Sequence, residues 1–387
     1  MPERRLTYCG NVHAAPDLPT FLGSLREHTG AVAAAARAAG VPFGVGAFWP
    51  QPLAERLWRD AAARDQVAEA LRAIGAPLWT LNVFPFEGFH DEVVKTAVYR
   101  PDWGEEERLA HTRTCAEVAA RLVPAGATVP LSTLPLGYRA PGDAAADLRR
   151  MARNLVRCAS AFAAIESERG VRCVLALEPE PDCLLETCAA TAEFFEQWLF
   201  AAGAWQTVPE HVLRRHLGVC VDLCHLAVVG EDPLQALADL AARGIEVAKI
   251  QVSACFEARD PAGLDQLLAF DEPRYLHQTA AAGLRALDLD EVRRRRDQFA
   301  AAGRVRSHYH VPLYWDDAGG LGSTRAEVER VLRALGASTA PLPLLEVETY
   351  TWTVLGDRFG SAPLAEHLWR ELQFAHDALG LAADRHG

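Results

Sequence analysis

The chain lacks several features that would assign it to a class at once. Its 387 residues contain no run of roughly 18 or more apolar residues, and the start, MPERRLTYCGNVH, has no apolar signal core. The nine cysteines show no repeated C-x-x-C spacing, and several lie inside apolar runs. We therefore expect a soluble, cytoplasmic protein without membrane insertion, whose cysteines are buried reduced thiols rather than disulfides or zinc ligands.

The chain also lacks an excess of positive charge. Its formal net charge is -12 and its pI is about 5.6, which argues against nucleic acid as a partner. The run Arg293–Arg296 is the local exception, and its polar helical surroundings predict a solvated helix face balanced by nearby acids. No G-x-G-x-x-G or G-x-x-x-x-G-K-[ST] follows a predicted strand, so nothing requires nucleotide binding.

What the sequence does contain is a regular alternation of short apolar runs with alanine-rich helical stretches. The pattern predicts one domain, 1–387, with the α/β fold of a TIM (β/α)8 barrel; an open doubly wound sheet is the alternative. Helices are expected at about 18–39, ended by Gly40, and at about 143–169, ended by Gly170. The predicted strands are 6–10, 43–48, 78–83, 128–133, 173–178, 217–222, 247–252 and 343–348.

One connection is too long for an ordinary crossover. About ninety residues separate Gln251 from the last predicted strand. We expect a long helical insertion after strand 7, at about 253–304, followed by the strand-like piece VRSHYHVPLYW, which returns to the barrel mouth. A C-terminal helix is expected at about 363–379. Long insertions after barrel strands commonly shape the active site.

Four of the apolar runs end in a polar residue: Glu178, Asp222, Gln251 and Glu346. Residues at the carboxyl ends of successive barrel strands converge at one mouth. Three carboxylates and an amide all offer oxygen to a divalent cation such as Mg, Mn, Co or Zn. The alternative for each residue is a helix cap or a turn position just past its strand.

Strand alternation places further polar residues on the same inward face. Lys249 falls one layer below Gln251, which favours a buried ion pair with a carboxylate; the alternative is a role as acid, base or ligand of a substrate anion. Glu180 and Glu348 each follow a proposed ligand by two residues, so they are candidates to support the ligands.

Three histidines accompany the carboxylates. His225 follows Asp222 by three residues, and His308 and His310 share a face if SHYHVP is extended. Neutral imidazole is a common ligand of transition metals. We predict that these histidines lie at the metal site.

Other residues near the predicted strand ends could bind a substrate. His13, Asn82 and Arg139 offer polar groups, and Arg139 could meet an anion or form a surface salt bridge. Trp49 and Trp315 could supply apolar faces for a ring or could simply pack.

The order Glu, Asp-x-x-His, Gln and Glu at successive strand ends resembles the xylose-isomerase-like TIM-barrel superfamily. The resemblance implies a catalytic divalent metal held by Glu178, Asp222, Gln251 and Glu346, and a second ion near His225, His308 and His310. Two strand ends of this chain, TLNVF and PLSTL, lack the histidines that endonuclease IV has there, which argues against cleavage of damaged DNA.

Longer segments resemble the EboE family, often named metabolite traffic protein EboE. They include YCGNVH, TLNVFPFEGFH, LEPEPDCLLET, DLCHLAV and HYHVPLYWDDAGGLGST, and they extend from residue 8 to about residue 324. The family's name connects it with traffic of metabolites, and its reaction is not established. The resemblance therefore bears more on the fold than on the reaction.

The superfamily resemblance implies an isomerase or epimerase that acts on a small polyhydroxylated carbonyl compound, a sugar, sugar phosphate or cyclitol, through an enediolate. Glu178 and Glu346 would move the proton, with Lys249 and His225 as further catalytic candidates. One ion, or two, of Mn, Zn, Co, Mg or Fe would be bound. The alternatives are a metal-dependent hydrolase or lyase, and a metabolite-binding barrel without catalysis.

Overall fold

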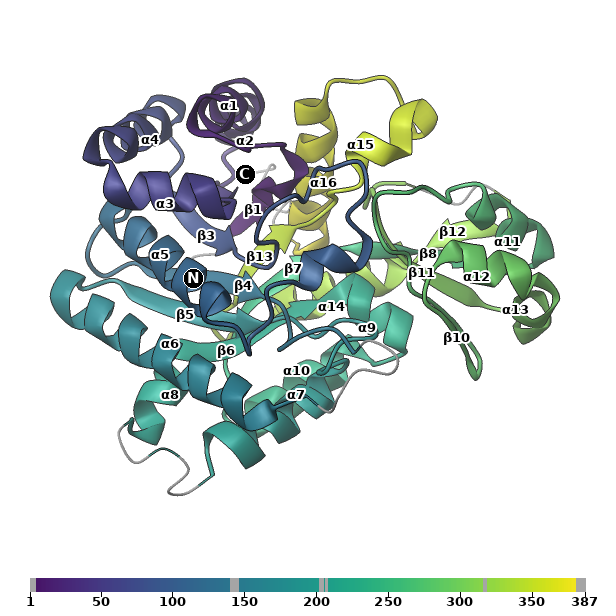
Figure 1. Cartoon of the computed structure of the whole chain (residues 1–387). Coiled ribbons are helices and arrows are strands. Elements are labelled where there is room, and N and C mark those ends of the chain that lie inside the picture. Colours follow the sequence, from purple (N-terminus) through teal and green to yellow (C-terminus); the bar gives the residue numbers. More distant parts are fainter. Residues whose placement is uncertain (1–4, 140–145, 202–204, 206–207, 316–318, 381–387) are drawn as a thin grey trace.

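Eight parallel strands form the centre of the protein. The computed structural model describes residues 5–139, 146–201, 205, 208–315 and 319–380. The strand order is β1-β13-β7-β6-β5-β4-β3-β2, and a parallel bridge between Cys9 and Gly46 joins the two edges into a barrel (Figure 1). The strands are β1 (Leu6–Tyr8), β2 (Val45–Phe48), β3 (Leu78–Asn82), β4 (Thr128–Thr133), β5 (Arg172–Leu177), β6 (Leu217–Asp222), β7 (Val247–Val252) and β13 (Leu344–Val347).

The barrel strands confirm the predicted TIM (β/α)8 architecture. Each strand lies within the predicted range or within one residue of it. Their side chains are almost all buried, because one set fills the barrel and the other packs against the surrounding helices. Strands buried on both faces appear in a sequence as short continuous apolar runs, which is why the sequence predicts them well.

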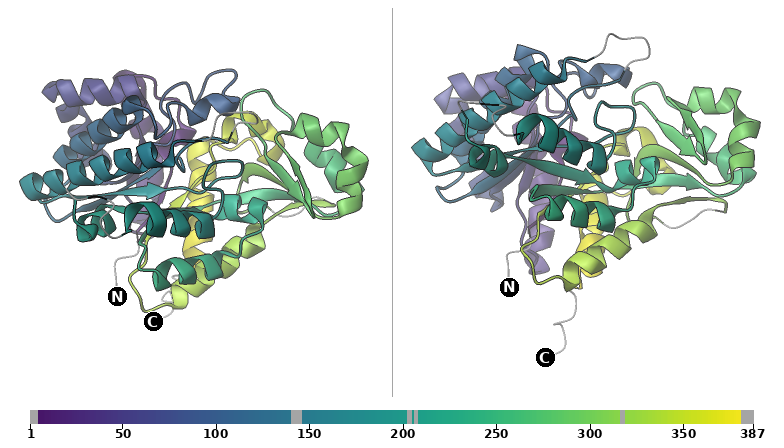
Figure 2. Two further views of the ribbon diagram at one scale, coloured as in Figure 1. Left: turned by 60° about the horizontal axis from the view of Figure 1, so that its bottom comes forward. Right: turned by 90° about the horizontal axis from the view of Figure 1, so that it is seen from below.

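Helices surround the barrel on its outer side (Figure 2). They are α1 (Leu18–Ser24), α2 (Gly30–Ala38), α3 (Gln51–Arg59), α4 (Ala61–Ile74), α5 (Glu106–Leu122), α6 (Leu148–Arg169), α7 (Cys188–Phe194), α8 (Glu210–His216), α9 (Leu223–Val229), α10 (Pro233–Ala242), α14 (Arg325–Ala337), α15 (Trp352–Leu355) and α16 (Leu364–Ala378).

Caps account for several helix boundaries. The Asp147 side chain accepts the Arg150 N–H at the start of α6, and Gly170 ends that helix in the left-handed conformation, with φ 69°. The predicted start at residue 143 lies outside the described residues. The predicted first helix is α1 and α2 joined by a π-helical turn (Leu25–Thr29). Its predicted end at Gly40 and the predicted C-terminal helix both agree with the structure.

The insertion after β7 contains a second sheet as well as helices. Its five strands pair in the order β10-β9-β11-β8-β12, all antiparallel. Figure 1 shows this lobe, in green, beside the barrel. We expected a helical insertion, and the difference lies in the strands β8, β9, β10 and β12. The elements are β8 (Ala254–Ala258), α11 (Pro261–Leu268), β9 (Thr279–Ala281), β10 (Leu284–Ala286), α12 (Leu289–Arg294), α13 (Arg296–Ala302), β11 (Val305–Val311) and β12 (Leu321–Ser323).

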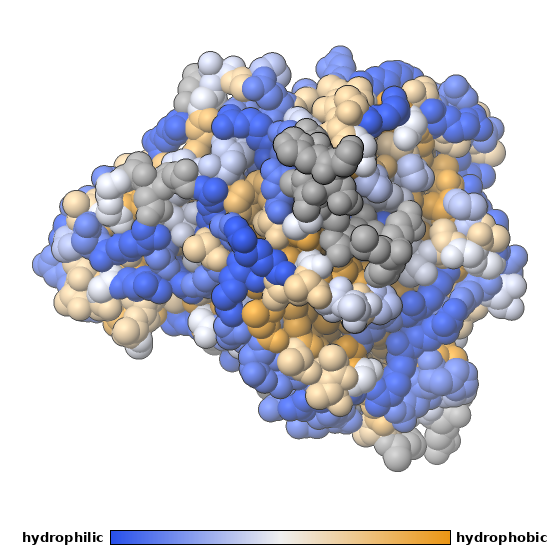
Figure 3. All heavy atoms as spheres, turned by 180° about the vertical axis from the view of Figure 1, so that it is seen from behind, coloured by the Kyte–Doolittle hydropathy of each residue, from blue (hydrophilic) through white to orange (hydrophobic). Residues whose placement is uncertain are grey.

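The surface and the thiols agree with the charge and cysteine patterns. All nine cysteines are buried and none is in a disulfide. The arginine run forms ion pairs with acids of the insertion: Arg293 with Asp271, Arg294 with Asp290, Arg295 with Glu291 and Arg296 with Asp265. On the face seen from behind, hydrophilic residues cover much of the surface and hydrophobic residues gather near the middle (Figure 3). No helix among the described residues is long and apolar enough to cross a membrane.

Strand register brings the predicted polar residues to one end of the barrel. Glu346 of β13 pairs in register with Gln251 of β7, and Gln251 pairs with Asp222 of β6. Glu178 directly follows β5, and its backbone N–H donates to the carbonyl of Thr133. The carboxyl ends of the four strands therefore carry the candidate site.

Candidate metal centre

Three buried carboxylates form the first half of the site. An oxygen from each of Glu178, Asp222 and Glu348 lies within 4.8 Å of the other two. Their side chains are buried, and Asp222 is fully enclosed. Burial, followed by the negative charge of Asp222, raises the pKa of Glu348 to about 8. Burial and the charge of Glu348 raise the pKa of Glu178 well above its usual value. Negative charges packed this closely call for a compensating cation.

The hydrogen bonds of these carboxylates leave some oxygens free. Asp222 Oδ1 accepts the His225 N–H at 2.8 Å and the Ser253 hydroxyl at 2.9 Å. By contrast, Asp222 Oδ2 and Glu178 Oε2 are buried and have no hydrogen-bond partner. A buried carboxylate oxygen without a donor is costly, so these two atoms are available to a metal ion.

Two amides orient the third carboxylate. Glu348 Oε1 accepts hydrogen bonds from Asn11 at 2.8 Å and from Asn82 at 3.1 Å. Because an amide donor holds one oxygen of Glu348 from each side, the carboxylate has a fixed position at the barrel mouth. Neither amide removes the carboxylate charge.

Three imidazoles form the second half of the site. Each ring donates its Nδ1–H to a carbonyl oxygen, so each Nε2 carries a lone pair. The acceptors are the carbonyls of Pro179 for His225, of the Gln278 side chain for His308 and of Glu348 for His310, at 2.9, 2.7 and 2.8 Å. A ring held in this way is typical of a metal-ligating histidine.

The three Nε2 atoms converge. The Nε2 of His308 lies 3.1 Å from that of His225 and 3.3 Å from that of His310. Burial lowers the pKa of His308 well below its usual value and that of His310 to about 4, so neither ring is protonated near pH 7. Neutral nitrogens whose lone pairs face one another repel, and a shared cation removes the repulsion. The residues present therefore fit a bound divalent metal ion.

Asp222 connects the two halves. Its Oδ2 lies 3.9 Å from His310 Nε2, and its Oδ1 lies 3.9 Å from His225 Nε2. Asp222 belongs to two of the four candidate ligand groups among the described residues, one with Glu178 and Glu348 and one with His225 and His310. These side chains could bind one ion, or two ions that share Asp222 as a ligand.

A narrow cavity lies above these groups. Glu178, Glu348 and the three histidines line its polar side. Phe89, Tyr275 and Tyr350 line its apolar side, with ring centroids 4.9 to 5.4 Å apart. The insertion supplies both a histidine pair and part of this aromatic wall, which explains why a barrel would carry so long a connection.

Comparison with known proteins assigns the fold to a family. A family model described as "Xylose isomerase-like TIM barrel" matches residues 33–303, which is more than half of the chain. The chain belongs to this family. No curated protein matches the sequence.

Solved structures are similar to this xylose isomerase-like barrel at low identity. A xylose isomerase-like TIM barrel protein from Mycobacterium smegmatis in complex with magnesium is 14% identical, with TM-score 0.49, over 98% of this chain and 97% of its own. D-psicose 3-epimerase with D-tagatose, from Clostridium cellulolyticum H10, is 12% identical, with TM-score 0.48, over 98% and 99%. The IOLI protein with a zinc atom is 12% identical, with TM-score 0.48, over 97% and 98%.

Inside the xylose isomerase-like barrel, Glu346 lies against Lys249. The candidate ligand group that holds Glu178 and Asp222 contains Glu348 and does not contain Glu346. Glu346 Oε2 lies 2.5 Å from Lys249 Nζ, and both side chains are fully buried. Burial is the largest influence and disfavours the charged amine, but the charge and hydrogen bond of Glu346, together with nearby Cys220 and Cys9, outweigh it and raise the pKa of Lys249 above its usual value. This is the ion pair predicted for Lys249, and it leaves Glu346 Oε1 buried without a hydrogen-bond partner.

The deeper layer also contains Gln251 and a glycine. The Gln251 side chain is fully buried, and neither of its amide atoms has a hydrogen-bond partner, so its oxygen stays available to an ion. A Cβ on Gly46 of β2 would lie 2.1 Å from Glu346 Oε1. Glycine at this position therefore makes the room that the Glu346 carboxylate needs.

Of the five residues expected to bind substrate, Asn82 lines the cavity and the other four lie elsewhere. His13 accepts or donates a hydrogen bond at the Tyr8 hydroxyl and stacks on His28. Trp49 is buried beside Phe21, Trp315 packs on aromatic rings of the insertion, and Arg139 is exposed and donates to the Leu184 carbonyl.

Sequence reasoning did not single out Asn11, Ser253 or Gln278, which hold the ligands in place. Asn11 lies within YCGNVH, a segment that carries the resemblance, and Ser253 follows Gln251 by two residues on the same face. Gln278 lies far from His308 in the sequence and has no local signal. Only the folded insertion brings it to the ring.

Proposed function

We propose that this chain is a divalent-metal-dependent isomerase or epimerase of a small polyhydroxylated carbonyl compound, acting through an enediolate. The observation that carries the proposal is the group of three buried carboxylates, Glu178, Asp222 and Glu348, beside three imidazoles whose Nε2 atoms converge. These residues would hold the ion. A bound divalent ion supplies a Lewis acid that holds two adjacent substrate oxygens and acidifies the carbon-bound proton between them.

Glu178 and Glu348 are the proton-moving residues of this proposal. Both side chains reach the cavity from different strands, β5 and β13. Burial and the charge of Asp222 raise the pKa of Glu348 to about 8 in the metal-free protein, so this carboxyl group can hold a proton near neutral pH. Glu348 replaces Glu346 in the pair expected from the sequence, because Lys249 holds Glu346 below the cavity.

The cavity wall favours a compound with one polar and one apolar face. The cavity is lined by the amides of Asn11 and Asn82 and also by the aromatic trio of Phe89, Tyr275 and Tyr350. Sugars and cyclitols present hydroxyls at their edges and C–H groups on their faces, which match this wall.

The small number of lysine and arginine side chains that line the cavity favours a substrate without a phosphate group. Among the described lining residues, Lys95 is the one lysine or arginine. Its amine already donates to Asp288 at 2.6 Å and to two backbone carbonyls of the insertion. An uncharged sugar or cyclitol therefore fits better than its phosphate. The resemblance to the EboE family would place the reaction in a pathway of secondary metabolism or metabolite traffic.

A metal-dependent hydrolase or lyase is the second candidate. It is favoured by the three-histidine group, because Asp222 belongs to a carboxylate group and to a histidine group of candidate ligands and could bridge two ions. Paired ions a few ångströms apart commonly activate water for hydrolysis. A barrel that only binds a metabolite is the third candidate, and the cost of burying these carboxylates without a cation speaks against it.

The test is exchange of carbon-bound hydrogen with solvent. Purified protein is first analysed for bound metals, then loaded with Mn²⁺, Co²⁺ or Zn²⁺ and incubated in D₂O with a panel of ketoses, aldoses and keto-cyclitols. Proton NMR should show deuterium entering the carbon next to the carbonyl. The Glu178→Gln and Glu348→Gln variants should lose the exchange, while Glu69→Gln, whose side chain is 69% exposed, should retain it.

Other results would overturn the proposal. Hydrolysis of ester or phosphodiester probes without exchange would establish the hydrolase. Binding of panel compounds without either reaction would establish the metabolite-binding barrel. If the purified protein contains no metal and binds none of the added ions, the proposal of a metal centre is wrong.

A further inference from the structure

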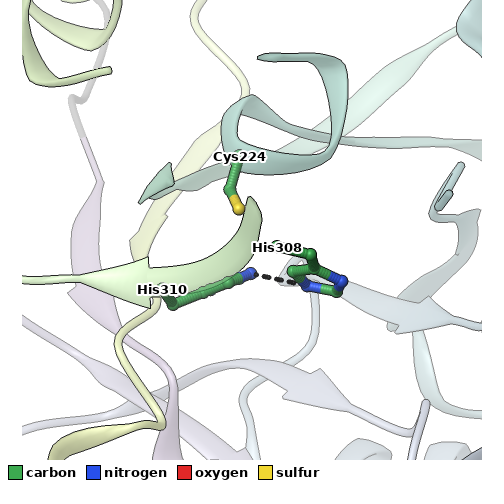
Figure 4. A group of neighbouring side chains, drawn as sticks. All are labelled: Cys224, His308 and His310. Carbon is green, nitrogen blue, oxygen red and sulfur yellow. Dashed lines mark hydrogen bonds between the residues drawn. The ribbon is translucent and has the colours of Figure 1, made fainter. Parts of the chain in front are cut away.

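A cysteine side chain points at the histidine half of the site. The sulfur of Cys224 and one ring nitrogen from each of His308 and His310 lie within 4.8 Å of one another. Figure 4 shows the sulfur, carried by the first turn of α9, directed toward the two rings on β11. All three side chains are buried.

The surroundings of Cys224 hold its sulfur in this direction. The other side of the thiol packs in a small apolar cluster with Ala227, Val228 and Cys255. The Cys255 thiol and the backbone of Tyr309, the residue between the two histidines, lie beside the sulfur. Cys224 therefore has a fixed place, and its open side faces the ring nitrogens.

The histidines give an independent reason to expect a ligand at this point. Their Nδ1–H groups are donated to the Gln278 side chain and the Glu348 carbonyl, so their Nε2 lone pairs are free and only 3.3 Å apart. Two imidazoles and a thiolate are a donor set for a borderline or soft ion, above all Zn²⁺. The group of Glu178, Asp222 and Glu348 offers only oxygen, which suits Mg²⁺ or Mn²⁺.

We propose that Cys224 is the sulfur ligand of a zinc-class ion held by His308 and His310, and that this site is chemically distinct from the oxygen site beside it. When the sulfur–metal bond forms, the thiol gives its proton to solvent, and no electron transfer is involved. Asp222, whose Oδ2 lies 3.9 Å from His310 Nε2, is placed to complete the ligand set. The inference rests on the histidine half of the metal centre proposed above and not on the isomerase reaction.

Cobalt is the spectroscopic probe for a sulfur ligand. The metal-free full-length protein, with its thiols reduced, is titrated anaerobically with Co²⁺, and binding is followed by equilibrium dialysis and by near-ultraviolet absorption. Wild type should show the sulfur-to-cobalt charge-transfer band at one equivalent. Cys224→Ser should lose the band completely. Cys255→Ser is the matched control, because Cys255 lies in the same cluster and belongs to none of the candidate ligand groups among the described residues, so it should retain the band.

X-ray absorption on the wild type loaded with one equivalent of Zn²⁺ does not depend on any variant folding. A sulfur scatterer at about 2.3 Å, beside nitrogen at about 2.0–2.1 Å, is expected. Co²⁺ or Zn²⁺ that binds with only nitrogen and oxygen neighbours would overturn the inference and leave the metal centre standing. Loss of the band in Cys255→Ser with retention in Cys224→Ser would also overturn it. If neither ion binds the wild type, the metal centre fails and the inference fails with it.

Discussion

The ammonium of Lys249 lies 2.5 Å from Glu346 Oε2 in the middle of the barrel, and both side chains are fully buried. Lys249 also donates to the Ser132 hydroxyl at 3.1 Å. The pair lies directly below the candidate metal centre. Burial raises the pKa of Glu178 and of Glu348, and the positive charge of Lys249 lowers both values by a smaller amount.

Removing one partner of this pair should be costly. Lys249→Met leaves Glu346 buried without its counter-charge, and we expect a loss of about 3–5 kcal/mol in the free energy of unfolding. The Lys249→Met/Glu346→Gln double variant should recover part of the loss. Chemical denaturation measures both. As a control, Arg294→Met breaks the pair with Asp290, whose side chains are 66% and 60% exposed, and should cost less than about 1 kcal/mol. Equal losses at the two positions would contradict this account.

The room for Glu346 depends on Gly46. A Cβ there would lie 2.1 Å from Glu346 Oε1 and 2.6 Å from the Tyr8 carbonyl. Gly46→Ala should therefore destabilise the fold by about 1–3 kcal/mol or more, as overpacking does. Gly23 in α1 is the matched control, because a Cβ there meets nothing within 4 Å. Gly23→Ala should be neutral or stabilise by about 0.5–1 kcal/mol. Thermal unfolding of the two variants decides the matter, and a stable Gly46→Ala protein would show that Glu346 can move.

Glu346 in β13 and Glu348 just after this strand should differ in their effect on metal binding. Glu348→Gln removes a carboxylate from the candidate ligand group. Loss of a residue that only supports a ligand typically lowers metal affinity by about 10- to 100-fold. We expect the loss of affinity for Mn²⁺ or Zn²⁺ in Glu348→Gln to be larger than that. Glu346→Gln should change affinity by only a few-fold, and its main effect should be on stability. Isothermal titration of both variants separates the roles. The reverse order of affinities would restore Glu346 as the ligand.

For Glu346 and Glu348, the sequence predicts one feature of the site and leaves another open. Alternation along a strand puts Glu346 and Glu348 on one face, and both side chains point into the barrel. Which of them reaches the metal layer depends on the stagger of the strands and on the buried amine of Lys249. Neither quantity is visible in a local pattern. The sequence therefore predicts the face that the two glutamates share, and the choice of Glu348 as the ligand is a proposal from the structure.

The same contrast holds for the fold. Barrel strands such as β5 and β6 are buried on both sides, and their apolar runs predict them within one residue. The insertion strands β9, β10 and β12 have three residues each, which is too short for any periodic signal. Gln278, which lies just before β9, could therefore not be connected with His308 from the sequence.

Gln278 provides a test of how the insertion supports the site. Its side-chain carbonyl accepts the His308 Nδ1–H at 2.7 Å, and its amide donates to the Tyr99 hydroxyl at 2.9 Å. Gln278→Leu should free the ring and lower metal affinity by about 10- to 100-fold, while Gln278→Glu should keep the acceptor and most of the affinity. Gln235→Leu, at an exposed position of α10, is the control. Unchanged affinity in Gln278→Leu would mean that His308 needs no such support.

Metal binding should strengthen as pH rises toward about 8. Burial and Asp222 raise the pKa of Glu348 to about 8 from an ordinary value of 4.5, so the metal-free protein holds a proton there at neutral pH and must release it to bind an ion. Because the pKa of Glu348 is higher in the folded than in the unfolded protein, the metal-free fold loses stability as pH rises from about 4.5 to about 8. A bound cation offsets that loss.

The measurable consequence is a pH-dependent difference in melting temperature. The Tm of the metal-loaded protein minus that of the metal-free protein should grow between about pH 5 and pH 8 and level off above it. His310, whose pKa is lowered to about 4, stays neutral in this window and should not affect the slope. In Glu348→Gln the slope should flatten, and titrations in buffers of different ionisation enthalpy should show less proton release. A Tm difference that is constant with pH in the wild type would mean that Glu348 is already ionised in the metal-free protein.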